Sequence, residues 1–183
     1  MMSKNRFSKK KQGVSVMVGY MLLVVFLIII SAIVYQWIKT YVPRESLECP
    51  DGTSLYLSSA SFDPSDLKLT ITIKNNGRFN VAGYFLHASN SSEQEIPIND
   101  LSSCLNESDG PGFVLGSSVS FFEAGTNLFS PSDETTHFFD VPDSVGTPYS
   151  IKITPTRFQE DNGKTRFVSC GDASTEILVN ILT

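Results

Sequence analysis

Residues 9–30 read KKKQGVSVMVGYMLLVVFLIII, and the character of the chain changes within two residues. Three lysines and a glutamine lead to Gly13, and no charged residue then occurs from Val14 to Ile38. A helix of about 25 residues is ~37 Å long, more than the roughly 30 Å hydrocarbon core of a bilayer. The stretch therefore predicts one membrane-spanning helix, over residues 14–42.

The far end of this run carries the signals of a membrane–water boundary. Tyr35, Trp37 and Tyr41 cluster there, and such rings favour the boundary. Pro43 disfavours helix at the residue before it, so the helix should end near Tyr41 or Val42. The run exceeds the 7–15 apolar residues of a secretory signal, and no small residues suitable for cleavage follow it. We expect the helix to stay with the mature protein.

Charge is distributed very unevenly along the 183 residues, whose net charge is −5. All 19 acidic residues lie after Gly13, while five basic residues precede Val14: Lys4, Arg6, Lys9, Lys10 and Lys11. Because lysine and arginine favour the cytoplasmic side of a first span, the N-terminus should stay inside and the body should be exported. An acidic body also lacks the clustered cations that bind phosphates, which argues against a nucleic-acid partner.

The lysine-rich tip, Gly13 and the following Val14–Gly19 segment together resemble the N-terminus of archaeal type IV pilin-like precursors, pilins and archaellins with a class III signal peptide. The resemblance covers roughly residues 9–42. In that family a membrane-embedded prepilin peptidase cuts before the apolar segment. The resemblance implies a leader over residues 1–13, cleavage between Gly13 and Val14, and assembly of the mature subunit with its copies in a surface filament.

The helix should supply the contacts of such a filament. Ser15 and Gly19 form a small-xxx-small pair, which lets helices approach closely, and Ser31 and Ala32 form a second small patch. The sequence departs from the family at Gln12, where lysine or arginine is usual. The glutamate that is the fifth mature residue of bacterial relatives is also absent, because Val18 stands there. The alternative is an uncleaved single-span protein that displays an immunoglobulin-like binding domain outside the cell.

Beyond a predicted linker at 43–54, the pattern changes from helical to alternating. From Leu67 to Lys74, apolar and polar residues alternate, which is typical of a half-buried strand. Asn75-Asn76-Gly77 then predicts a hairpin turn to a partner strand over 79–88. Further strands are expected over 54–60, 117–122, 135–141, 149–155, 166–170 and 176–181, with a turn at 161–163 and a long surface loop over 93–116. The fold class is α+β: a long N-terminal hydrophobic helix followed, over 55–183, by an all-β immunoglobulin-like sandwich.

The sequence offers little catalytic or metal-binding chemistry. His87 and His137 are the only histidines, and each is interpreted as an ordinary strand residue. Asp63 and Asp66 frame a turn, and Asp140 and Asp143 lie close together, but neither pair has the spacing of a calcium-binding loop. We predict that the protein is not an enzyme and has no metal or cofactor.

Cysteines and sequons fit an exported body. Cys49, Cys104 and Cys170 could form one disulfide with one thiol left over, but the spacing does not say which pair forms, and three unpaired thiols remain the alternative. Asn90 and Asn106 begin N-x-Ser sequons, so each is a candidate for N-glycosylation. We expect the chain in the cell membrane before assembly and on the cell surface in a filament afterwards.

Overall fold

The computed structural model describes residues 9–41, 47–94, 96–122, 126–161 and 163–182, with the helix side chains described from 16 to 39. Two compact units are present, Met1–Ser46 and Leu47–Thr183, and each is described by itself. The predicted class, a long helix followed by an all-β sandwich, is confirmed. Residues 1–8 of the predicted leader and 42–46 around the predicted linker lie outside the described residues.

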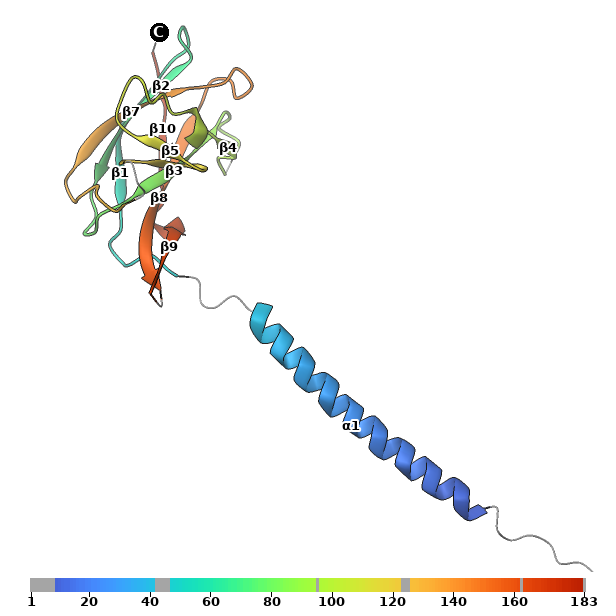
Figure 1. Cartoon of the computed structure of the whole chain (residues 1–183). Coiled ribbons are helices and arrows are strands. Elements are labelled where there is room, and N and C mark those ends of the chain that lie inside the picture. Colours follow the sequence, from blue (N-terminus) through green and yellow to red (C-terminus); the bar gives the residue numbers. More distant parts are fainter. Residues whose placement is uncertain (1–8, 42–46, 95, 123–125, 162, 183) are drawn as a thin grey trace, which may run out of the picture. The chain divides into compact units, whose positions relative to one another are not determined.

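Helix α1 runs from Lys9 to Tyr41 (Figure 1). It ends where the sequence predicted, but it begins five residues before Val14, so Gly13 lies inside the helix. Lysine and glutamine are good helix formers, which accounts for the earlier start.

The described residues of the β unit form eleven strands in two sheets. Their bounds are β1 Leu55–Asp63, β2 Lys68–Asn75, β3 Gly83–Ser89, β4 Asn99–Asp100, β5 Phe113–Leu115, β6 Ser118–Ser120, β7 Glu134–Asp140, β8 Ser150–Asp161, β9 Lys164–Ser169, β10 Thr175–Leu178 and β11 Asn180–Ile181. One sheet has the order β11-β1-β2-β7, and the other has the order β10-β8-β3-β6-β5, with β4 paired to β3 and β9 paired to β8. The alternation predicted around β2 is confirmed, because Leu69, Ile71 and Ile73 are fully buried between the sheets.

The predicted hairpin between β2 and the following strand is wrong. Strand β2 pairs with β1 and β7, whereas β3 belongs to the other sheet. The Asn75 side chain explains the crossing: its Nδ2 donates hydrogen bonds to the carbonyl oxygens of Phe79 and Phe129, at 3.0 and 2.9 Å, and its Oδ1 accepts one from Gly77 N. A buried amide that binds two carbonyls outside the turn holds the chain away from hairpin geometry.

The segment predicted as a long surface loop, 93–116, is instead anchored. It contains β4, β5 and a 3₁₀ turn, Ser102–Cys104, and Leu101 is fully buried. Ser102 Oγ also accepts a hydrogen bond from Leu86 N at 2.9 Å. The polar composition concealed these contacts because only a few buried residues are needed to fix such a segment.

The turn predicted at 161–163 is found, whereas the strand predicted over 176–181 is divided in two. The turn predicted at 161–163 closes the β8–β9 hairpin, with Asp161 opposite Lys164, although Asn162 itself lies outside the described residues. The strand predicted over 176–181 is divided: β10 pairs antiparallel with β8 in one sheet, and β11 pairs parallel with β1 in the other. This final segment therefore connects the edges of both sheets.

Candidate functional site: the exposed apolar helix

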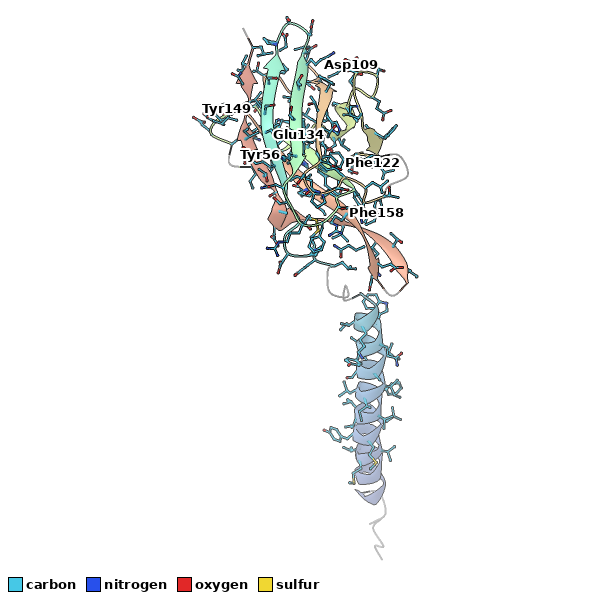
Figure 2. All side chains as sticks on the ribbon, turned by 90° about the vertical axis from the view of Figure 1, so that its left-hand side faces the viewer. Tyr56, Asp109, Phe122, Glu134, Tyr149 and Phe158 are labelled. Carbon is cyan, nitrogen blue, oxygen red and sulfur yellow. A yellow bond between two sulfur atoms is a disulfide. The ribbon has the colours of Figure 1, made fainter. Side chains whose placement is uncertain are left out.

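The apolar surface of α1 is exposed on every side. The segment Val16–Lys39 has 24 residues, and its most apolar 18 residues have a mean hydropathy of 2.9 and are not buried by any other part of the described structure. Side chains project all around the helix axis (Figure 2). A helix that is apolar all round needs an apolar environment, either lipid or other helices. By length and composition, α1 can cross a membrane.

The C-terminal end of α1 combines aromatic and cationic groups. Lys39 Nζ lies 5.1 Å from the centre of the Tyr35 ring, and Trp37 is 64% exposed. Rings with a polar edge and a lysine that can extend to water are favoured at the headgroup level. A membrane–water boundary at this end of α1 stays a prediction.

The predicted small residues do not form one continuous groove. At about 100° per residue, Ser15 and Gly19 lie about 40° apart, whereas Ser31 is about 120° and Ala32 about 140° from Gly19 around the axis. A Cβ added at Gly19 would have no described atom within 4 Å other than the helix itself. The side chains of Gly13, Val14 and Ser15 lie outside the described residues. Gly19 therefore marks one open small-residue face, and the other patch faces elsewhere.

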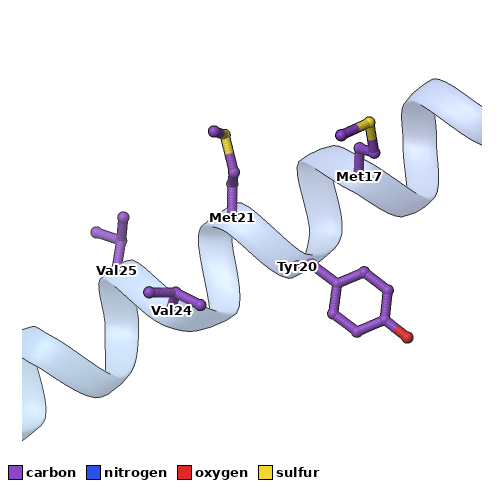
Figure 3. Close-up of a pocket in the computed structure, with 5 residues that line it drawn as sticks. All are labelled: Met17, Tyr20, Met21, Val24 and Val25. Atoms are coloured by element: carbon purple, nitrogen blue, oxygen red, sulfur yellow. The ribbon is translucent and has the colours of Figure 1, made fainter.

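A shallow apolar hollow occurs on a different face of α1 (Figure 3). Five side chains line it: Met17, Tyr20, Met21, Val24 and Val25. Met17 lies about 160° around the axis from Gly19, so this methionine face is nearly opposite the small-residue face. Sequence reasoning missed the hollow, although the spacing of Met17, Met21 and Val25 by four residues was its signal.

Neither histidine forms part of a recognisable catalytic arrangement in the described residues. His137 is 1% exposed, and its Nδ1 lies 2.6 Å from Tyr84 Oη, between the sheets. Burial lowers the pKa of His137 to about 4. His87 is half-buried on β3, and its side chain lies on the opposite face of the strand from the buried Leu86. The two histidines therefore lie apart: His137, on β7 of the four-stranded sheet, is buried in the core, whereas His87, on β3 of the seven-stranded sheet, points away from the core.

The acidic residues make local contacts. Asp63 Oδ1 accepts hydrogen bonds from Ser65 N and Oγ, which lower the pKa of this carboxyl. Asp140 accepts a hydrogen bond from Asn106, and Lys68 forms an ion pair with Asp109. Within the described part of the chain, no group of three or more histidine, cysteine, aspartate or glutamate residues is placed to hold a metal ion.

The structure resolves the question left open by the cysteines. Cys49 and Cys170 form a disulfide with a Cα–Cα distance of 5.4 Å, and Cys104 is the half-buried thiol. Cys170 is 2% exposed. The bond joins residues separated by 121 positions, a pairing that only the tertiary fold brings together.

The two sequon asparagines are in different environments. Asn90 is exposed, and its Nδ2 donates a hydrogen bond to Val145 O at 3.3 Å. Asn106 is half-buried: its Nδ2 donates to Asp140 at 3.0 Å and its Oδ1 accepts from Ser108 N at 3.1 Å. The amide nitrogen that a glycan would modify is therefore more accessible at Asn90.

No protein-family model and no curated protein matches this sequence. Among solved structures, the ligand-binding region of Serine-glutamate repeat protein A (SgrA) of Enterococcus faecium aligns with 71% of this chain and 98% of its own, at 10% identity and a TM-score of 0.30. A likeness this distant supports no statement about the fold or function of the present chain.

Proposed function

We propose that this protein is a pilin-like structural subunit of an archaeal type IV pilus-like surface filament. The observation that carries the proposal is the apolar part of α1, whose side chains are exposed all around and which directly follows a lysine-rich tip and Gly13 in the sequence. The helix would wait in the membrane with its N-terminus in the cytoplasm. A prepilin peptidase would cut after Gly13, and Val14 would become the first residue of the mature subunit.

The charged tip gives this cleavage a physical purpose. Moving one charged side chain into hydrocarbon costs on the order of 3 kcal/mol even on the mildest scale, and the tip carries five cations. These charges would hold the helix in the bilayer. Once they are removed, the helix can pass from lipid into a core of like helices, because both environments are apolar.

The two faces of α1 favour an open polymer over a closed dimer. The small-residue face around Gly19 and the methionine face around Met17 and Met21 lie nearly opposite one another. A flexible methionine surface adapts to the shape of its partner. If the small face of one copy packs on the methionine face of the next, the contact is head-to-tail, and such contacts extend into rings or helical filaments.

The acidic, disulfide-bonded β unit suits the outside of such a filament. All 19 acidic residues lie after Gly13, and a persistent disulfide is typical of an exported domain. In this position the β unit would form the soluble coat of the polymer and carry any adhesive surface. The acidic residues and the disulfide also suit a mature subunit that is displayed on the cell surface.

Mass spectrometry of the membrane-extracted protein, expressed with its prepilin peptidase, tests the first step. We expect a chain that begins at Val14, and a Gly13→Asp variant that keeps its leader and yields no filaments on shearing. Val18→Ala is the matched control, since it changes the apolar run without touching the cut. An intact leader on the native protein would contradict the proposal. It would favour the alternative, an uncleaved single-span protein that displays a binding domain.

A further inference from the structure

The chain enters the β unit beside its disulfide. The β unit begins at Leu47, and Cys49 lies six residues before β1. Any pull transmitted along the chain from α1 therefore reaches Cys49 before it reaches a strand. From there the covalent path divides, because Cys49 is bonded to Cys170.

The two branches lead into different sheets. One follows the chain from Cys49 to Leu55 and into β1, in the four-stranded sheet. The other crosses the disulfide to Cys170, which directly follows β9 and whose backbone N–H donates a hydrogen bond to Pro155 O of β8. Strand β8 pairs with β3, β9 and β10 in the seven-stranded sheet.

Tension that entered the β unit through β1 alone would meet little resistance. The parallel partner of β1, β11, is in register only with Ser61 and Phe62. Within the described residues, the leading part of β1, from Leu55 to Ser59, has ladder bonds to β2 alone, supplemented by the Thr175 hydroxyl, which donates to Leu55 O at 2.9 Å. A strand held mainly along one side can be peeled away one hydrogen bond at a time.

We propose that the Cys49–Cys170 disulfide is a mechanical clamp that divides tension arriving from α1 between both sheets of the β unit. A second tie lies at the same place: Gln159 Nε2, on β8, donates a hydrogen bond to Glu48 O at 3.3 Å. The clamp requires only that α1 is anchored, in a filament or in a bilayer. It therefore survives failure of the filament proposal, which the mass measurement decides separately.

Single-molecule pulling on the full chain in detergent micelles tests the clamp. One handle is attached at the N-terminus and the other through a short tag inserted at Gly146, which lies between β7 and β8 and where an added Cβ would have no described atom within 4 Å apart from its chain neighbours. With the disulfide intact, the shorter route from residue 170 to 146 limits the lengthening on unfolding to about 80 Å. Without it, the route from residue 49 to 146 allows about 330 Å, roughly four times as much.

We compare three samples: wild-type protein, wild-type protein treated with a phosphine reductant, and Cys49→Ser. Cys104→Ser is the matched control, because it leaves the disulfide intact. We expect the control to behave as wild type, and the reduced protein and Cys49→Ser to lengthen about four times as much and to unfold at a lower force. Equal unfolding forces with and without the bond would overturn load sharing. Loss of any unfolding step on reduction would also overturn it, because the bond would then be needed for folding itself.

Discussion

Tyr84 and His137 connect the two sheets of the β unit through a buried hydrogen bond, with Tyr84 Oη 2.6 Å from His137 Nδ1. Tyr84 lies on β3 and His137 on β7, and both are at most 1% exposed. Their rings are nearly parallel, with centroids 5.7 Å apart. Among the described residues His137 Nε2 has no hydrogen-bond partner, so the imidazole has little capacity to accommodate an added charge.

Acid should weaken the β unit through His137. The unfolded chain binds a proton at this residue near its ordinary pKa of 6.5, whereas burial lowers the pKa in the folded chain to about 4. The stability of the folded chain is therefore undiminished by His137 above about pH 6.5. As the pH falls toward 4, protonation of His137 in the unfolded chain lowers the free energy of unfolding by up to about 3 kcal/mol. Urea unfolding of the full chain in detergent at pH 7 and pH 4.5 measures it. A His137→Gln variant, which cannot titrate there, should lose most of this pH dependence, and an unchanged dependence would contradict the assignment.

Removing the Tyr84 hydroxyl should destabilise the β unit at neutral pH. Tyr84→Phe leaves His137 Nδ1 buried without a partner, and such a group costs about 1–3 kcal/mol. Tyr56→Phe is the matched control, because Tyr56 is 52% exposed and should cost less than about 0.5 kcal/mol. Equal unfolding midpoints for the two variants in urea would refute a stabilising role for the buried hydrogen bond.

Gly83 should not tolerate a side chain. An added Cβ would lie 2.0 Å from Val119 O, where β3 pairs with β6, so backbone atoms would have to separate. We expect Gly83→Ala to lower the free energy of unfolding by about 3 kcal/mol or more. Gly171→Ala should be nearly neutral, because no described atom lies within 4 Å of its added Cβ. Thermal unfolding followed by near-ultraviolet circular dichroism distinguishes the two, and a stable Gly83→Ala protein would show that the strands can separate at little cost.

The two sequons should differ in both occupancy and structural role. Asn90 is the more accessible acceptor, so intact-mass measurement of Asn90→Gln and Asn106→Gln proteins from the native host should show the larger glycan loss for Asn90→Gln. Asn106→Gln should cost about 1 kcal/mol, because it disturbs the hydrogen bonds to Asp140 and Ser108. Asn90→Gln should leave unfolding in urea unchanged. Higher occupancy at Asn106 would show that the segment around it opens before modification.

The small-residue face of α1 should be sensitive to added bulk. In the proposed filament, Gly19→Leu would prevent close helix approach and reduce the yield of sheared filaments at least tenfold, while membrane insertion is unaffected. Val34→Leu, which adds volume on an already bulky part of α1, is the control and should assemble normally. Filament yield is measured by electron microscopy and by the amount of protein released on shearing. Normal assembly of Gly19→Leu would exclude this face from the subunit contact.

Local pattern predicted the elements that depend on neighbouring residues alone. The apolar run after Gly13 predicted α1 and its end at Tyr41, because membrane-length hydrophobicity is a property of consecutive residues. The period of two before Asn75 predicted β2 and its buried face, since alternate side chains of any strand point to opposite sides. The apolar composition of the sequence therefore predicted α1 as the candidate site. The opposite positions of its small-residue and methionine faces followed only from the helical geometry.

Pairing across the chain was decided by the tertiary structure. The turn residues at 75–77 predicted a hairpin, yet the Asn75 amide binds Phe129 O, 54 positions away, and β3 joins the other sheet. The choice of Cys170 over Cys104 as the partner of Cys49 likewise depended on which strands meet. By itself the sequence determined that an apolar helix precedes an alternating β unit, because those signals are local and additive. Only the tertiary structure decided which strands, rings and thiols meet, because contacts between distant residues depend on how all the strands pack at once.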